Sequence, residues 1–289
     1  MIRDSALTPP ATRRSRHTGY TTVVYLLLIS GAIVSLFPFW YMLITSLKPQ
    51  SYIFEIPPRL IPAEVTVENY RRALQRDNFG RYFINSMFVA AITTVLTVTV
   101  SSMLAYAFAR LRFPGRKALF ILIIAGLMIP PVMLIIPQFL VARNLYLLDT
   151  YLGLILVYVA MNLPMQSFLL RGFLAGIPRD IEESAFMDGA GQWLVWSRLI
   201  LPLSKPALAV VTIFSFVYSW DEFAWAHVAI RTSIRRTLPI AIAFFQTQHK
   251  TEWGIVFAAS IISLVPVVTL FVLFQRTFIE GITTTGLKG

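Results

Sequence analysis

The stretch PRDIEESAFMDGAGQWLVWSRLILP, residues 178–202, decides the fold, because it is a long segment of mixed polarity between two apolar runs. Pro178 suits the first turn of a helix, and the acids that follow it favour the positive end of the helix dipole. The Gly-Ala-Gly sequence at 189–191 breaks that helix, since glycine turns freely into left-handed conformations. A second helix is predicted from Gln192 to Pro202, where proline stops it. Its apolar face contains Trp193, Trp196 and Ile200.

The composition is that of an integral membrane protein. Of 289 residues, 56% are hydrophobic and only 13% are charged, whereas soluble domains carry about 25% charged residues. The net charge of +11 is attributed to membrane orientation rather than to nucleic-acid binding, because the cations lie mostly between apolar runs. Cysteine is absent, which excludes disulfides and thiolate metal sites, and the three histidines lie too far apart in sequence to suggest a metal centre.

Six apolar runs predict an all-α membrane protein with six transmembrane helices. The first run follows a polar segment, 1–19, and could be a signal peptide. It is nearer to the ~20 residues of a membrane span than to a signal sequence, and no cleavage site follows it, so an uncleaved span is favoured. The predicted spans are 20–43, 83–109, 118–140, 151–173, 206–226 and 256–274, within a permease domain of 20–277 that a tail, 278–289, follows.

Two of the runs contain features unusual for a membrane span. The second is rich in hydroxyl side chains, which predicts a face packed inside the protein rather than toward lipid. The third contains Pro130, Pro131 and Pro137, which release backbone carbonyls and predict either a simple kink or part of a solute pathway. The hydroxyl residues are Thr93, Thr94, Thr97, Thr99, Ser101 and Ser102.

The orientation follows from the loop at 110–117, which holds four cations in eight residues and therefore predicts a cytoplasmic position. With six spans, both termini are then cytoplasmic, and the connections 51–81 and 227–253 are external. The second of these is itself basic, which runs against the orientation rule.

Three short patterns in segment 178–202 resemble the EAA loop of ABC-importer permeases. They are Glu-Ser-Ala at 183–185, Asp-Gly-Ala at 188–190 and a final Leu-Pro at 201–202. Ser184 departs from the usual alanine but remains small. Together with 45–49, 110–115, 220–223 and 280–289, they are similar to MalG-type permeases, the inner-membrane components of binding-protein-dependent carbohydrate importers.

The resemblance implies a set of partners. These are a second EAA-loop permease, two copies of a cytoplasmic ABC ATPase, an external solute-binding protein and the lipid bilayer of a bacterial inner membrane. The loop would be the coupling helix that docks into the ATPase through Glu183, Ser184, Ala185, Asp188, Gly189, Ala190, Leu201 and Pro202. The chain lacks the G-x-x-x-x-G-K-[ST] phosphate loop. No cofactor is therefore expected in this chain, and the ATPase subunits would bind ATP and Mg.

A pair of acids, Asp221 and Glu222, marks a candidate solute pathway. Counted from Pro206, Asp221 lies about 22 Å along the fifth span at ~1.5 Å per residue, a depth at which a carboxylate avoids lipid. The alternative is that the helix ends earlier and the acids lie at the membrane interface, against Arg231 or Arg235. The candidate pathway or gate residues are Asn162, Tyr218, Trp220, Asp221, Glu222 and Phe223.

Three functions remain open from the sequence. The first is a permease for a sugar or oligosaccharide, and the second is the same subunit for glycerol-3-phosphate, a polyol or another small solute. The third is a secondary transporter or a membrane enzyme. That third class is expected to have membrane-embedded charge pairs or an internal repeat, and only the Asp221–Glu222 pair comes near this pattern.

Overall fold

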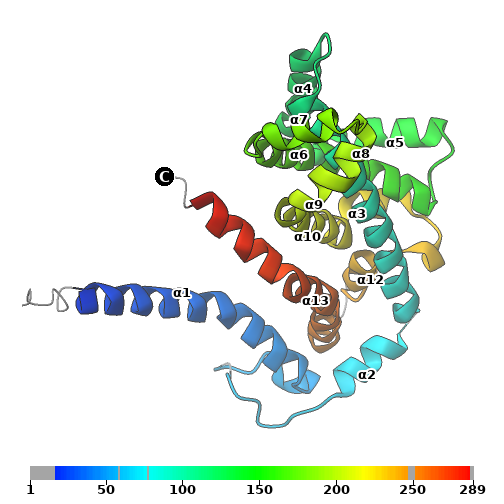
Figure 1. Cartoon of the computed structure of the whole chain (residues 1–289). Coiled ribbons are helices and arrows are strands. Elements are labelled where there is room, and N and C mark those ends of the chain that lie inside the picture. The colour runs from blue at the N-terminus through cyan, green and yellow to red at the C-terminus, as the bar shows by residue number, and fades with distance from the viewer. Residues whose placement is uncertain (1–16, 58, 77, 247–250, 287–289) are drawn as a thin grey trace, which may run out of the picture.

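Four long helices form the framework of the molecule (Figure 1). The structure is a computed structural model that describes residues 17–57, 59–76, 78–246 and 251–286. Residues 1–16 of the predicted N-terminal segment and 287–289 of the predicted tail lie outside this range. The described residues contain no β-strand, only an isolated bridge between Gln246 and Thr251. The long helices are α1 (His17–Ser46), α3 (Phe79–Arg110), α6 (Tyr151–Ala175) and α13 (Trp253–Gly286).

Two more apolar segments are sharply bent. The predicted third span, 118–140, is not one straight helix: α4 (Arg116–Ala125) continues to Met128 and meets segment Pro131–Asn144, which ends in α5 (Ile135–Asn144), at 100°. Pro130 and Pro131 cause the break, because neither has an N–H to donate to a continuing helix. The other bend, of 82°, joins segment 192–203 to α10 (Lys205–Asp221).

These segments bear directly on the six-span prediction. The described residues contain four helices that are long and apolar enough to cross a membrane, or six spans if each bent pair is counted as one. The predicted fifth span, 206–226, ends early, because α10 stops at Asp221 and a separate short helix, α11 (Ala224–Ala229), follows an extended Glu222.

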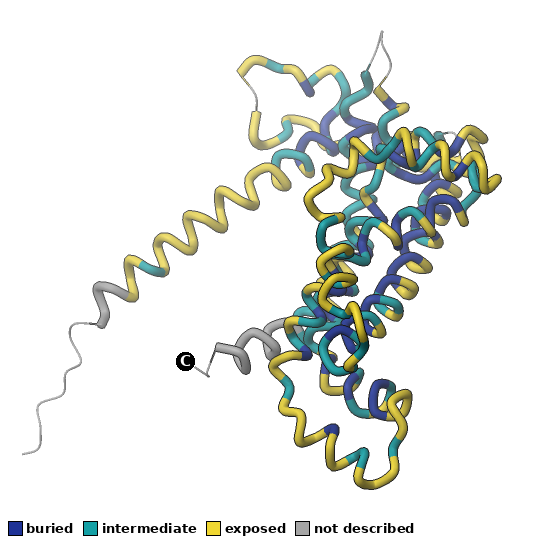
Figure 2. The backbone as a smooth tube through the Cα atoms, turned by 90° about the horizontal axis from the view of Figure 1, so that it is seen from above, coloured by how far each residue is buried: buried dark blue, intermediate teal, exposed yellow. Residues whose placement is uncertain are grey.

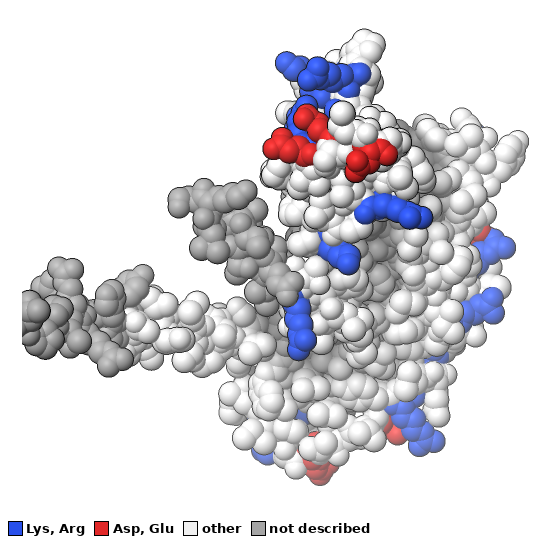
Figure 3. Space-filling view, in the orientation of Figure 1, with Lys and Arg blue, Asp and Glu red and all other residues white. Residues whose placement is uncertain are grey.

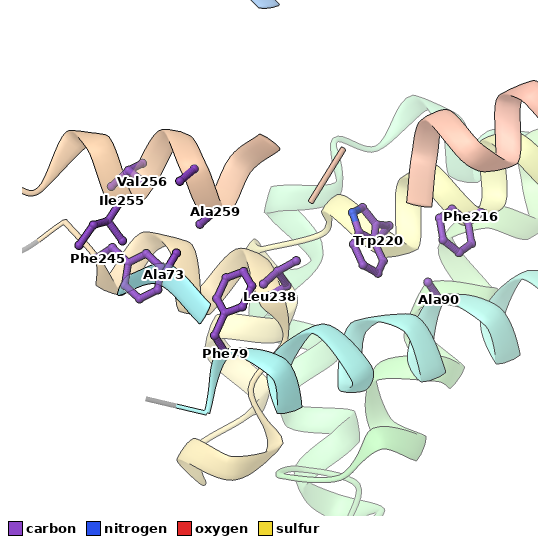
Figure 4. Packing of buried hydrophobic residues seen from close by; sticks show 11 residues of the cluster. Ala73, Phe79, Ala90, Phe216, Trp220, Leu238, Phe245, Ile255, Val256 and Ala259 are labelled. Atoms are coloured by element: carbon purple, nitrogen blue, oxygen red, sulfur yellow. The ribbon is translucent and has the colours of Figure 1, made fainter. Parts of the chain in front are cut away.

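The predicted connections are also partly helical. Segment 51–81 contains α2 (Glu68–Gln75), and segment 227–253 contains α12 (Leu238–Phe244). The second connection is therefore more than a polar loop, because Leu238 is only 1% exposed and packs in a core with residues of α3, α10 and α13 (Figure 4). The labelled core side chains are Ala73, Phe79, Ala90, Phe216, Trp220, Leu238, Phe245, Ile255, Val256 and Ala259.

Helix α3 lies at the centre of the fold and packs against both α6 and α10. Its hydroxyl residues Thr93, Thr97 and Ser101 are fully buried, as predicted for a face inside the protein. Thr99 is on the exposed side and donates to the carbonyl of Val95 at 2.8 Å, so this hydroxyl is satisfied within its own helix. This face fixes which side of α3 faces its neighbours, because small side chains at a helix interface let the backbones of packed helices approach closely.

The two ends of α3 mark two ends of the molecule. Near Phe79 lie α2 and the long connection that precedes it, and near Arg110 lie the start of α4 and segment 178–202 (Figure 1). At the α2 end, Arg72 and Arg76 bind the carboxylate of Glu252 at 2.6 and 2.8 Å and tie α2 to the start of α13. Helix α1 extends away from the body: its residues from Val23 to Trp40 are largely exposed, and among its described side chains only the last, Ile44 to Ser46, are buried (Figure 2).

Candidate functional site

Segment 178–202, here called the EAA loop, forms the predicted helix and glycine turn. Helix α7 (Asp180–Met187) is followed by Asp188 and then by Gly189, whose φ of +85° is the left-handed conformation that glycine adopts without strain. The N–H of Gly189 donates to the carbonyl of Phe186, and that of Ala190 to the carbonyl of Ala185, both at 3.0 Å. This pair of bonds is a Schellman motif, which satisfies the last carbonyls of the helix and fixes the direction of the chain.

The predicted coupling residues divide into an exposed and a packed group. Glu183, Ser184, Asp188 and Gly189 are exposed, as is Pro202 at the far end of the loop. Ala185, Ala190 and Leu201 are partly buried against the core beneath the loop. The exposed group presents two carboxylates and a glycine turn, which leaves this surface open to another molecule.

The second half of the EAA loop is helical, as predicted, but it is not a uniform α-helix. Helix α8 (Gln192–Leu194) runs into a π-helical turn, Val195–Ile200, and then into α9 (Leu201–Leu203). Helical structure runs without a gap from Gln192 to Leu203 and the chain bends at Ser204, so the predicted end of the helix at Pro202 is confirmed to within one residue. Two of the three residues predicted on the apolar face, Trp196 and Ile200, are buried. The third, Trp193, is 66% exposed.

A buried ion pair, which the sequence reasoning missed, connects the EAA loop to α3. Arg110 lies 2.6 Å from the carboxylate of Glu182, and both side chains are 6% exposed. The same guanidinium donates to the carbonyl of Ile177 at 2.8 Å. Burial raises the pKa of Glu182, and the positive charges of Arg110 and Arg179 lower it, with the rise prevailing. Sequence offers no signal for this pair, because its members lie 72 positions apart (182 minus 110) in different elements.

A second contact holds the other half of the loop to the same helix. The Tyr106 hydroxyl donates to the side-chain oxygen of Gln192 at 2.6 Å. Tyr106 and Arg110 are separated by four positions, so one face of α3 contacts both α7 and α8. The EAA loop is therefore attached to the central helix at two points.

Three of the predicted pathway residues line one cavity of about 610 Å³ between α1, α10, α12 and α13. They are Trp220, Asp221 and Phe223, and the other polar side chains in the lining are Gln246, Ser260 and Ser263. Asp221 forms no salt bridge within the described part of the chain, so its carboxylate is available to the cavity. The predicted alternative partner Arg235 instead binds Asp149 at 3.1 Å.

The other three predicted pathway residues lie elsewhere. Glu222 accepts hydrogen bonds from the Tyr158 hydroxyl at 2.6 Å and from the N–H groups of Trp225 and Ala226, at 2.7 and 3.1 Å. It therefore satisfies the first N–H groups of α11 and joins that helix to α6. Tyr218 packs edge-to-face on Tyr158, with the ring centroids 6.3 Å apart. Asn162 is buried and donates to the carbonyl of Tyr158 at 2.8 Å, away from the larger cavity.

A row of rings begins at the cavity and was not predicted. Phe223 stacks on His227, with 5.1 Å between centroids, and His227 lies 6.2 Å from the ring of Phe244. The guanidinium of Arg236 lies over Phe244 at 4.4 Å. Such exposed ring faces can stack on the apolar faces of a sugar ring. Among the described residues, no group of three or more histidine, aspartate or glutamate side chains is placed to hold a metal ion.

The comparisons with known proteins agree with this architecture. A model of the family "Binding-protein-dependent transport system inner membrane component" matches residues 98–283. The sulfoquinovosyl glycerol transport system permease protein SmoH of Agrobacterium fabrum is 36% identical over 264 residues, which is 91% of each chain. The trehalose transport system permease protein SugB of Mycobacterium tuberculosis is 35% identical and aligns over 95% of this chain and 99% of its own.

A solved structure extends the likeness to three dimensions. One chain of a bacterial ABC transporter that imports the acidic polysaccharide alginate superimposes with a TM-score of 0.75 and 25% identity, over 94% of this chain and all of that one. The family model covers well over half of the chain, from the middle of α3 through the EAA loop and into α13. This chain therefore belongs to the inner-membrane components of binding-protein-dependent transport systems, the multi-pass permease subunits of ABC importers.

Proposed function

We propose that the chain forms half of the translocation pathway of an ATP-driven importer for a sugar or an oligosaccharide. The support for a carbohydrate comes from the relatives, whose names specify trehalose, sulfoquinovosyl glycerol and alginate. These solutes differ in size and charge, so the common element is the hydroxylated ring. Glycerol-3-phosphate, a polyol or another small solute is the alternative within the same family.

The partners in this proposal are a second EAA-loop permease, two copies of a cytoplasmic ABC ATPase and an external solute-binding protein. ATP and Mg would bind to the ATPase subunits. The exposure of α1 supports a partner or lipid on that side, because a helix with this many exposed large apolar residues is unstable in water. The name of the family itself specifies dependence on a binding protein.

The EAA loop is the surface that would dock on the ATPase. The single observation that carries this role is the fixed turn at Gly189, which presents Glu183 and Asp188 on an exposed surface while Arg110 and Tyr106 hold the loop to α3. A carboxylate in such a position suits a basic group in a partner groove. Closure of the ATPase dimer would then move α3 through these two contacts.

The 610 Å³ cavity is the part of the pathway that this chain would contribute. Its lining combines an aromatic surface with one unpaired carboxylate and several hydroxyl and amide groups. Ring faces can stack on the aromatic surface, and sugar hydroxyls can donate to Asp221. We place the gate or solute contact of this chain at Trp220, Asp221 and Phe223, and we assign Tyr218, Glu222 and Asn162 to support of the helices around it.

The test uses proteoliposomes that contain the assembled importer with its cognate binding protein. The purified binding protein is first screened against sugars, polyols and glycerol-3-phosphate by a thermal-shift measurement. Uptake of the ligand found, together with ATP hydrolysis stimulated by the loaded binding protein, is then measured. A binding protein that takes only non-carbohydrate solutes would refute the proposed substrate class, and uptake that continues without ATP would refute the importer mechanism.

A further inference from the structure

A basic hollow opens where α4 begins, beside the EAA loop. It has a volume of about 680 Å³, and its lining contains four cations: Arg112, Arg116, Lys117 and Arg179. None of them forms a salt bridge within the described part of the chain. Figure 3 shows the cations gathered at this end of the molecule, next to the acidic surface of the EAA loop.

The hollow is held in shape by its surroundings. Phe113 and Phe120 both pack on the ring of the buried Phe108, with centroids 6.1 and 5.3 Å apart. The guanidinium of Arg116 donates to the carbonyl of Leu111 at 2.8 Å and thereby fixes the turn from the inside. The backbone around the hollow is therefore fixed by these contacts, and Arg112, Lys117 and Arg179 extend from it as exposed side chains.

The start of α4 adds a positive dipole to these charges. Gly115 precedes the helix with φ +77°, and no side chain caps the free N–H groups of the first turn. Helix α4 has 10 residues, so its aligned peptide dipoles place partial positive charge at this end. A dipole and four cations around one hollow are the combination that binds a phosphate group.

The apolar surface next to the hollow indicates what carries the phosphate. Directly after Lys117, the side chains of Leu119, Ile121 and Leu122 are 48%, 66% and 70% exposed. They belong to the first half of the bent pair 116–128 and 131–144, which is long and apolar enough to cross a membrane when the two halves are counted as one span. Exposed apolar side chains in such a pair suit contact with acyl chains. The hollow thus lies where this segment leaves the hydrocarbon, at the depth of lipid headgroups.

We propose that this hollow binds the phosphate of an anionic phospholipid, with the acyl chains along the exposed side of α4. An acidic surface of the ATPase would be a competing occupant. The lipid is favoured because the apolar side chains continue the binding surface away from the hollow, whereas a soluble partner could contact only its basic rim.

The test measures phosphatidylglycerol bound to the assembled importer by native mass spectrometry and by titration in nanodiscs against phosphatidylcholine. The site variant is Arg112→Gln with Lys117→Gln, and the matched control is Lys205→Gln with Arg276→Gln, which removes the same charge from exposed positions outside both the hollow and the EAA loop. Each surface cation strengthens binding to an anionic lipid by about fivefold at low salt, so the site variant should bind phosphatidylglycerol about 25-fold more weakly. The control should retain wild-type binding, as should Arg112→Lys with Lys117→Arg.

Three results would overturn the proposal. Equal loss of phosphatidylglycerol in the site and control variants would mean non-specific attraction to charge. Binding of inorganic phosphate with the affinity of the lipid would make the hollow a site for a free anion. Retention of the lipid together with loss of the ATPase subunit from the site variant would identify the hollow as a protein contact.

Discussion

At the scale of single residues, two neighbouring acids have different surroundings. Asp221 ends α10 and opens onto the larger cavity, whereas Glu222 accepts three hydrogen bonds that hold α11 against α6. The helix ends between them, so the two side chains leave the backbone in different directions. The two acids were predicted as one pathway element, with an earlier end of the helix as the alternative, and the end of α10 at Asp221 separates them.

Substituting the two acids one at a time should distinguish a residue that contacts the solute from a residue that stabilises the packing of the helices. Asp221→Asn keeps the shape but removes the charge, and loss of a hydrogen bond to a charged group should lower uptake by at least about tenfold while the importer still assembles. Glu222→Gln should lower the melting temperature of the complex, and Tyr158→Phe, which removes the hydroxyl donor to Glu222, should do the same. Uptake in proteoliposomes and thermal stability are measured on each variant. Wild-type uptake by Asp221→Asn would remove this residue from the pathway.

The buried pair of Arg110 and Glu182 gives a second prediction at this scale. Breaking a buried ion pair costs on the order of 3–5 kcal/mol, because the remaining charge is left unpaired, whereas replacing both charges by apolar groups is often neutral. Glu182→Leu alone should therefore destabilise the importer and loosen the EAA loop, and Arg110→Met with Glu182→Leu should recover stability. Differential scanning fluorimetry measures the stability. A double variant less stable than the single one would show that the pair itself stabilises this junction.

The double variant Arg110→Met with Glu182→Leu also tests whether the ion pair transmits movement of the EAA loop to α3. If the pair carries movement of the EAA loop to α3, the stable double variant should hydrolyse more ATP per solute imported than the wild type does. An unchanged ratio of hydrolysis to uptake would limit the pair to a structural role. Tyr106, which contacts Gln192 from the same face of α3, would then remain the candidate for transmission.

Among elements, the turn at Gly189 offers a matched comparison within one loop. A Cβ at Gly189 or at Gly191 would meet nothing within 4 Å, and both residues are exposed. Only Gly189 has a positive φ, of +85°, whereas Gly191 has an extended conformation that valine adopts readily. Gly189→Val should cost about 1–3 kcal/mol of local strain and displace α7, whereas Gly191→Val should be tolerated.

The readouts are co-purification of the ATPase and coupled uptake. Gly189→Val is expected to insert in the membrane but to lose the ATPase or to hydrolyse ATP without transport, and Gly191→Val should resemble the wild type. Equal uptake by the two variants would argue against a docking role for this turn. Loss of coupled uptake in both variants would instead indicate that this surface tolerates no added side chain, whatever the backbone conformation.

Sequence predicted the elements well where local chemistry decides them. The Gly-Ala-Gly turn and the buried hydroxyl face of α3 follow from conformational preference and from the lack of hydrogen-bonding groups in lipid. A kink at Pro130 and Pro131 was one of the predicted alternatives, but its angle of 100° and the burial of α12 were not predicted. A proline indicates that a helix can break but not by what angle, and an apolar loop segment does not reveal which helices will cover it.

For the whole molecule, orientation in the membrane is the property on which the coupling proposal depends. The EAA loop and the basic start of α4 lie at one end, and α2 with the connection before it lies at the other (Figure 1). The density of cations at 110–117 predicts that the EAA end faces the cytoplasm. Opposite ends of the molecule should therefore differ in their access to an impermeant reagent.

Because the chain has no cysteine, single-cysteine labelling tests this without background. Val65 and Met187 are 68% and 87% exposed, so differences in labelling between Val65→Cys and Met187→Cys report the side of the membrane rather than burial. In intact cells Val65→Cys should react with an impermeant maleimide and Met187→Cys should not. After permeabilisation and denaturation both should react, which shows that each cysteine is reactive. The reverse pattern in intact cells would place the EAA loop outside, where no ATPase could reach it, and the coupling role would fail together with the orientation.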